Sequence, residues 1–117
     1  MIALLVASGA ALGAPARWWI DLVIQRRWAP VFPWGTFSVN VAGSALLGAF
    51  AVSWSEKGAA LALFGIGFCG SLTTFSSFAW ESQRLLAAGV RSVALLNIVG
   101  TVCACLAAAA LGWWLAG

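Results

Sequence analysis

The segment that decides the fold reads Gly65-Ile66-Gly67-Phe68-Cys69-Gly70-Ser71-Leu72-Thr73-Thr74-Phe75-Ser76-Ser77-Phe78. It lies within an apolar run, roughly 59–88, that is too long for one straight helical crossing of a bilayer, which takes about 20 residues. Its glycines are followed by Ser and Thr residues, whose side chains compete with the helix for backbone hydrogen bonds. We therefore predict a helix that is broken near 70–74, midway across a membrane. The alternative is a kinked helix that serves only packing.

The rest of the chain has the composition of a membrane protein. Of its 117 residues, 63% are hydrophobic and 8% are charged, and the mean hydropathy is +1.01. A soluble domain carries about 25% charged residues, so lipid is the natural solvent for most of this surface. Three further apolar runs cover roughly 2–25, 33–54 and 91–115. They predict an all-α protein with four transmembrane helices in one domain, 1–117. Alternating polar and apolar residues, the pattern of a membrane β-barrel, are not seen.

The chain lacks the residues that several classes of function require. The chain has no His, and its cysteines, Cys69, Cys103 and Cys105, lie inside apolar runs without the spacing of a zinc site. We find no nucleophile–base pair and no phosphate-binding loop, so an enzyme is not expected. The net charge of +3 comes from a few arginines and does not indicate a nucleic-acid partner. A removable signal peptide is not expected either, because the first run ends in bulky residues at 17–19.

The predicted break has properties that suit ions. Irregular backbone at this depth is tolerated where it is buried in protein or lines a polar cavity. Freed carbonyl groups suit a hard cation, and the N-terminus of the second half-helix favours an anion. Phe75 and Phe78 are three residues apart and share a face just after the break. Because aromatic rings are positive at their edges, two such rings in a narrow pore would stabilise a small anion.

Polar and small residues recur every fourth position in two of the predicted helices. In the second these are Thr36, Asn40, Ser44 and Gly48, and in the fourth they are Asn97, Thr101 and Cys105. Such stripes lie on one helix face. They serve either close helix packing, as the Gly9/Gly13 pair of the first helix also does, or a polar pathway. Asn40 favours the pathway, because a mid-span carboxamide is costly and carries two donor hydrogens.

Charged residues near the ends of the predicted helices leave two interpretations open. Arg17 and Asp21 are four residues apart in the first helix. They either neutralise each other or Arg17 draws anions toward an entrance. Glu81 and Arg84, near the end of the third helix, either line an aqueous mouth or pair with each other.

Three motifs together resemble the Fluc (CrcB) family of fluoride channels. Residues 35–44, Gly-Thr-Phe-Ser-Val-Asn-Val-Ala-Gly-Ser, are similar to its Gly-Thr-x-x-x-Asn-x-x-Gly-Ser signature. Residues 70–78, with Glu81 after them, are similar to its Gly-Gly-Leu-Thr-Thr-Phe-Ser-Thr-Phe-x-x-Glu motif. Gly13 and Arg17-Trp18 match the end of its first helix. The resemblance covers nearly the whole chain.

The resemblance implies a fluoride-selective channel that exports fluoride passively across the cell's inner membrane. The family forms antiparallel dimers, with subunits inserted in opposite orientations, two pores and one central sodium ion. Carried over to this chain, the implied fluoride-pore residues are Asn40, Phe75 and Phe78, with Thr36 and Thr74 in support. The main-chain carbonyls of Gly70 and Thr73 would bind Na⁺, and Arg17 and Glu81 would lie near the aqueous vestibules.

The chain also departs from this family's pattern. Ser71 and Ser77 replace Gly and Thr of the motif, and Asn97 stands where many relatives carry Tyr. One side of the predicted membrane domain carries four or five arginines, depending on whether Arg17 is counted with Arg26, Arg27, Arg84 and Arg91, whereas the other side carries Lys57 and Glu56. A chain that inserts both ways has little such bias, so the partner is either a second copy or a paired paralogue.

Small multidrug exporters are the alternative reading of the sequence, since they too have four helices and form antiparallel dimers. Their proton coupling needs a membrane-embedded carboxylate in the first helix. The first helix of this chain offers only Asp21, near the helix end and beside Arg17, and Glu56 and Glu81 also lie at the ends of predicted helices.

Overall fold

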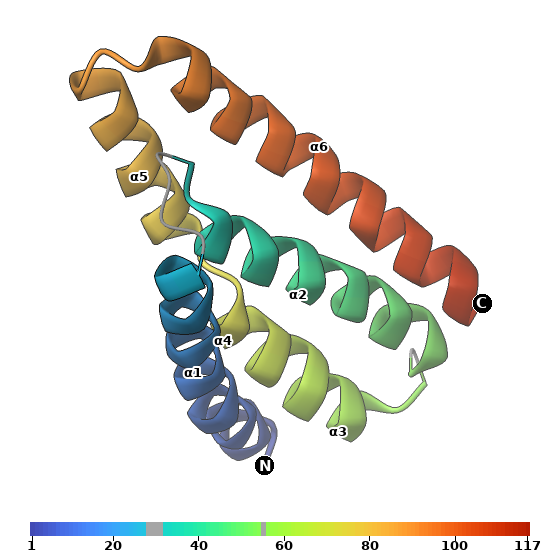
Figure 1. The fold of residues 1–117 in the computed structure, drawn as a ribbon. Helices are drawn as coiled ribbons and strands as arrows, with labels where there is room; N and C mark the ends of the chain where they lie inside the picture. Colours follow the sequence, from blue (N-terminus) through green and yellow to red (C-terminus); the bar gives the residue numbers. More distant parts are fainter. Residues whose placement is uncertain (28–31, 55) are drawn as a thin grey trace.

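The computed structural model describes residues 1–27, 32–54 and 56–117, and every regular element within these ranges is a helix (Figure 1). The order is α1 (Ile2–Arg27), α2 (Trp34–Ser53), α3 (Gly58–Ala60), the π-helical segment η1 (Leu61–Cys69), α4 (Gly70–Leu72), α5 (Phe75–Ala87) and α6 (Arg91–Ala116). Segments α3, η1 and α4 form one continuous rod, and α5 follows after a break. The predicted all-α fold of four helices, the third of them interrupted, is confirmed for the described residues.

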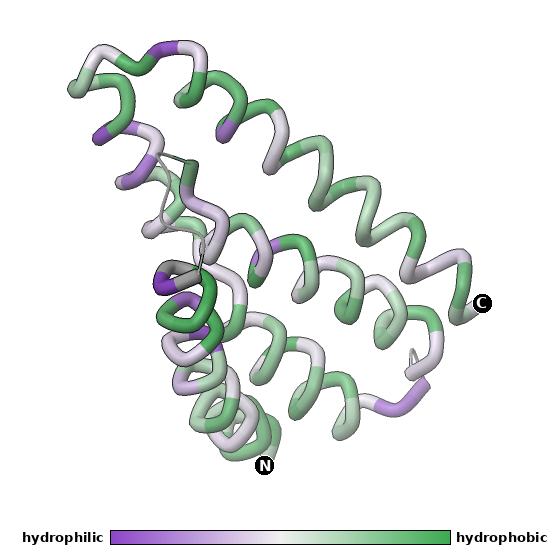
Figure 2. Tube along the Cα trace, viewed as in Figure 1, coloured by the Kyte–Doolittle hydropathy of each residue, from purple (hydrophilic) through white to green (hydrophobic). Residues whose placement is uncertain are grey.

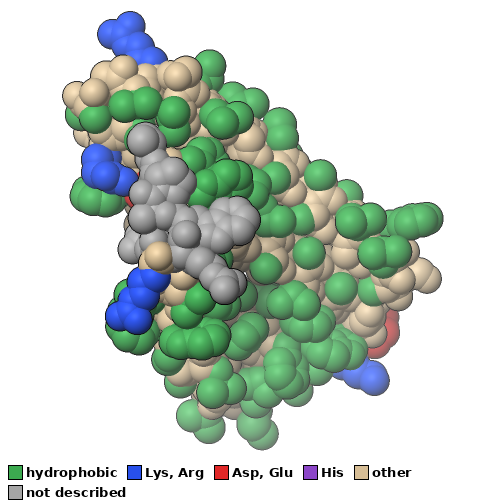
Figure 3. Space-filling view, in the orientation of Figure 1, with side chains coloured by type: hydrophobic (Ala, Val, Ile, Leu, Met, Phe, Trp, Pro, Cys, Tyr) green, Lys and Arg blue, Asp and Glu red, His purple; other side chains and the backbone are tan. Residues whose placement is uncertain are grey.

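Three of these helices are long and apolar enough to cross a membrane: Trp34–Ser53, the composite Gly58–Ala87 and Arg91–Ala116. Helix α1 carries Pro15, Arg17 and Asp21 and does not join this set. The four predicted crossings are therefore supported for three helices. Figure 2 shows apolar residues along the length of the helices, and Figure 3 shows Lys and Arg at the top, along the left margin and at the lower right, around a largely apolar face.

Helices pack in two close pairs, α6 along α2 and η1 along α1 (Figure 1). Glycine makes both contacts possible. A Cβ atom on Gly9 would meet the backbone of Leu63 and Phe68, and one on Gly112 would meet the backbone of Ala45 and Ala49. Close backbone approach at small residues is the usual basis of helix association in lipid, where van der Waals packing replaces the hydrophobic effect.

The break in the third helix lies at Thr73 and Thr74, inside the predicted window of 70–74. Both residues are extended, with φ −76° and ψ 157° at Thr73 and φ −147° and ψ 124° at Thr74. The Thr74 hydroxyl accepts a hydrogen bond from the Ser77 amide at 3.2 Å and so caps the first turn of α5. The π-helix before the break is a rare element that hydrophobic patterning does not reveal.

Candidate functional site

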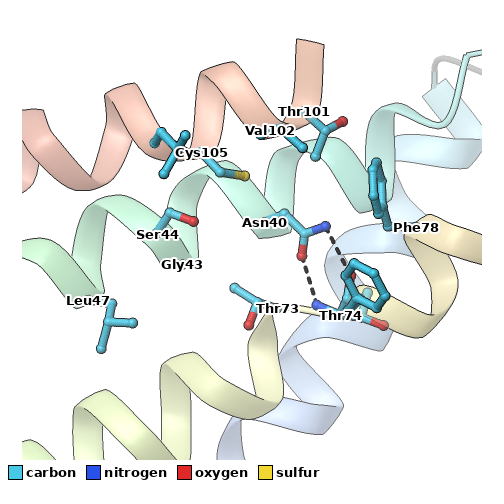
Figure 4. A pocket seen from close by; sticks show the side chains of 12 residues that line it. Asn40, Gly43, Ser44, Leu47, Thr73, Thr74, Phe78, Thr101, Val102 and Cys105 are labelled. Carbon is cyan, nitrogen blue, oxygen red and sulfur yellow. Dashed lines mark hydrogen bonds between the residues drawn. The ribbon is translucent and has the colours of Figure 1, made fainter. Parts of the chain in front are cut away.

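The break is held to α2 by a reciprocal pair of hydrogen bonds. The Asn40 amide nitrogen donates to the Thr74 carbonyl at 3.1 Å, and the Thr74 amide donates to the Asn40 carboxamide oxygen at 2.7 Å (Figure 4). Asn40 is 7% exposed. Its side chain satisfies two backbone groups that the interruption removes from the helical ladder, which explains the carboxamide in an apolar helix. One amide hydrogen of Asn40 remains beyond the bond to Thr74.

A cavity of about 360 Å³ lies beside this pair, between α2, the break, α5 and α6. Its lining combines short polar, aromatic and aliphatic side chains, and none of the described residues around it carries a charge: Asn40, Gly43, Ser44, Leu47, Thr73, Thr74, Phe75, Phe78, Thr101, Val102, Cys105 and Leu106. Figure 4 shows Asn40, Thr74 and Phe78 on one side of it and Thr101 and Cys105 above them on α6. An uncharged site with polar side chains of this kind suits a small ion that is coordinated by dipoles.

The two aromatic residues of the break lie together at this cavity. The ring centroids of Phe75 and Phe78 are 5.8 Å apart, and the rings are inclined at 54°. Phe78 is half-buried, whereas Phe75 is 78% exposed. Four of the predicted pore residues, Asn40, Thr74, Phe75 and Phe78, thus line one cavity.

Thr36, the fifth predicted pore residue, does not line this larger cavity. Its hydroxyl donates to the carboxylate of Glu81 at 2.5 Å, and both side chains are buried. Thr36 lines a second, smaller cavity of about 140 Å³, together with Arg17, Trp18, Asp21, Val39, Thr74 and Ser77. Thr74 lines both cavities and therefore lies between them.

The predicted vestibule residues take different positions relative to this second cavity. Arg17 lines it, with Asp21 one helical turn further along α1. Glu81 is 9% exposed and bound to Thr36, so it lies deeper than the expected aqueous mouth. The guanidinium of Arg84, the other residue considered as a partner for Glu81, lies 5.4 Å from the centre of the Trp80 ring.

The carbonyls of Gly70 and Thr73 both lose their usual helical partners at the break. The amide four residues after Gly70 belongs to Thr74, and it donates to Asn40. The amide four residues after Thr73 belongs to Ser77, and it donates to the Thr74 hydroxyl. Gly70 is exposed, and a Cβ built there meets no atom within 4 Å. Main-chain oxygens of this kind, at an open surface, fit the ligand preference of a hard cation.

The stripe on α6 divides between two roles. Thr101 and Cys105 line the larger cavity, whereas Asn97 is 1% exposed and bonds to Ser82 of α5. Sequence reasoning overlooked Ser82. Its position four residues after Phe78, which allows a hydroxyl to reach the Phe78 carbonyl, was the available signal.

Comparison with known proteins places these motifs in a family. The profile of the family described as "CrcB-like protein, Camphor Resistance (CrcB)" matches residues 4–113. The chain is 46% identical to the fluoride-specific ion channel FluC 1 of Frankia casuarinae, over 93% of this chain and 91% of the relative. It is 43% identical to FluC 1 of Streptomyces avermitilis, over 97% and 94% of the two chains. It is 47% identical to FluC 2 of Mycobacterium tuberculosis, over 90% and 82%.

Proposed function

This chain belongs to the CrcB-like family, and from that premise we propose that it is a fluoride-selective channel that exports fluoride passively across the inner membrane. It is an ion channel and not an enzyme. The observation that carries the proposal is the meeting of Asn40, Phe75 and Phe78 around one uncharged cavity at a helix break. Hydrogen fluoride enters a cell as a neutral molecule and ionises in the cytoplasm, and the membrane potential then drives the anion out.

The two cavities define the proposed path of the anion. Arg17 attracts fluoride to the smaller cavity, where the hydroxyl of Ser77 is available as a donor, whereas the hydroxyl hydrogen of Thr36 is bound to Glu81. The ion then passes Thr74 into the larger cavity. There the second amide hydrogen of Asn40 and the positive edges of the Phe75 and Phe78 rings replace its water shell. The absence of a fixed positive charge among the described lining residues allows the ion to leave again.

Fluoride efflux from liposomes tests this function. Purified protein is reconstituted into vesicles loaded with potassium fluoride, valinomycin is added, and external fluoride is followed with a selective electrode. We expect rapid efflux of fluoride and none of chloride from matched vesicles loaded with potassium chloride. Equal fluxes of the two anions, or a fluoride flux no faster than in protein-free vesicles, would refute the proposal.

The proposed assembly is an antiparallel dimer in which two copies cross the membrane in opposite orientations, with α1 as the fourth crossing of each. The 78% exposed ring of Phe75 at the cavity supports it, because a second copy would cover that ring. Arg17 lines a cavity and Arg84 packs on Trp80, so neither counts as a loop charge and the arginine bias is smaller than the sequence suggests. A paired paralogue is the alternative partner. Cross-linking of the chain expressed alone distinguishes the two, since only self-association yields a dimer.

A sodium ion at the dimer centre is the proposed structural cofactor. The carbonyls of Gly70 and Thr73 would hold it. Both oxygens lack their helical donors, because the Thr74 amide bonds to Asn40 and the Ser77 amide bonds to the Thr74 hydroxyl. When bound, the ion supplies the positive charge that joins the two broken helices.

We expect replacement of Na⁺ by N-methylglucamine to lower the thermal stability of the purified protein. A ligand present at 100 times its dissociation constant stabilises the native state by about 2.7 kcal/mol, which corresponds to a shift of several degrees in Tm. Differential scanning fluorimetry in detergent, at constant ionic strength, measures the difference. Potassium and caesium serve as controls for a general cation effect. A Tm that is the same in all four salts would contradict a sodium site.

A further inference from the structure

A continuous series of buried hydrogen bonds joins α6 to α5. The Thr101 hydroxyl donates to the Asn97 carboxamide oxygen at 3.2 Å, and the Asn97 amide donates to the Ser82 hydroxyl at 2.8 Å. The Ser82 hydroxyl in turn donates to the Phe78 carbonyl at 2.8 Å. Exposed fractions are 5% for Thr101, 1% for Asn97 and 5% for Ser82. The hydroxyls of Thr101 and Ser82 and the carboxamide of Asn97 therefore all have hydrogen-bond partners inside the protein, and the donor and acceptor of each bond are fixed.

Only the two ends of this series reach the ion cavity. Thr101 and Phe78 line it, whereas Asn97 and Ser82 do not. Ser82 already satisfies its own hydrogen within α5, so the helix itself does not require Asn97. What Asn97 adds is a tie between two helices, placed directly behind the cavity wall. A fully satisfied polar network in an apolar interior rigidifies the elements that it joins.

Helix α5 needs such a tie because it follows the break. Two extended residues, Thr73 and Thr74, separate it from α4, so the rod before the break does not fix its position. Toward α2 it is held by the bonds of Asn40 to Thr74 and of Thr36 to Glu81. Toward α6, α5 is held by the bond of Asn97 to Ser82.

We propose that Asn97 and Ser82 are positioning residues that set the separation of Phe78 and Thr101 across the ion cavity and thereby control the conductance of the channel. This inference rests on the proposed function. Neither residue contacts the ion. A shift of α5 moves the Phe78 ring relative to α6, and a narrow pore that coordinates a dehydrated ion is sensitive to such a shift.

Single-channel recording in planar bilayers tests the inference, because the unitary current reports on each open pore and not on the number of folded channels. We expect Asn97→Leu and Ser82→Ala each to lower the unitary fluoride current roughly fivefold. This factor corresponds to the net free energy of one buried hydrogen bond. The double variant should lose no more than Asn97→Leu alone, because that change already cuts the bond to Ser82. Ser82→Thr, which keeps the hydroxyl, should restore the current.

The matched control for the loss of an amide is Gln83→Leu, at the exposed position next to Ser82. Its unitary current should equal that of the unchanged chain. If Asn97→Leu does not fold, Ser82→Ala decides alone, because it removes one oxygen atom and leaves the bond between Asn97 and Thr101. Fewer active channels with an unchanged unitary current would overturn the inference and leave a purely structural role. An unchanged chain that carries no fluoride current would instead refute the proposed function.

Discussion

Replacement of Asn40 by leucine is expected to reduce fluoride flux by roughly two orders of magnitude. The two side chains are similar in size, so the cavity keeps its volume, but the change removes every polar atom that Asn40 contributes. The anion loses a donor, and the part-buried amide and carbonyl of Thr74 lose their partners. Hydrogen bonds to charged groups contribute about 1.5–3 kcal/mol and an unsatisfied buried group costs about 1–3 kcal/mol, which together account for a loss of this size.

Fluoride efflux from liposomes, at equal amounts of protein that elutes as the same oligomer, provides the measurement. Asn40→Asp separates the two contributions to the loss. Aspartate keeps an acceptor for the Thr74 amide but has no donor and adds a negative charge that repels the anion. We expect this variant to stay folded and yet to conduct as poorly as the leucine variant. Gln83→Leu makes the same amide-to-leucine change at an exposed position and should leave flux unchanged. Normal flux through Asn40→Leu would remove Asn40 from the pore.

The sequence was sufficient to locate the break but not the partners of the polar stripe. Glycines followed by Ser and Thr interrupt a helix locally, so the break at Thr73 and Thr74 follows from nearby residues. The spacing of Thr36 and Asn40 predicted one common face, whereas Asn40 bonds to Thr74 at the larger cavity and Thr36 bonds to Glu81 near the smaller one. These partners are 34 and 45 residues away along the chain, and helix crossing, which local periodicity does not encode, decides which of them meet.

Local periodicity also fails to predict the contacts of α6 and α1. Spacing placed Asn97 in a stripe with Thr101, but its contact with Ser82 depends on how α5 lies after the break. The first helix was expected to cross the membrane on the basis of the apolar run over roughly 2–25, while Arg17 and Asp21 within that run line a cavity. Composition and spacing thus predict a membrane protein with a polar pathway, and fluoride as the ion rests on family membership.

A large loss of stability is expected from Gly112→Ala. The added Cβ would meet the carbonyl group of Ala45 and the amide nitrogen of Ala49, which are backbone atoms of α2. Backbone atoms cannot move aside as a flexible side chain does, so α6 and α2 would have to separate. Overpacking of this kind costs about 1–3 kcal/mol of the free energy of unfolding, and more where the backbone itself must shift. Gly48→Ala, which would meet the backbone of Ala109 from the other side of the same contact, should have a similar effect.

Gly100→Ala is the matched control on the same helix. A Cβ atom at Gly100 has only the Leu96 Cδ1 atom at 3.9 Å for a neighbour, so alanine fits without strain. Because alanine is the better helix former by about 1 kcal/mol, this variant should be as stable as the unchanged chain or more so. Thermal unfolding in detergent, followed by tryptophan fluorescence, compares the two. Separation of α6 from α2 also opens the cavity wall that Thr101 and Cys105 form, so Gly112→Ala should lose flux along with stability. If Gly112→Ala unfolds at the same temperature as Gly100→Ala, the close contact between α2 and α6 is not what holds this side of the channel together.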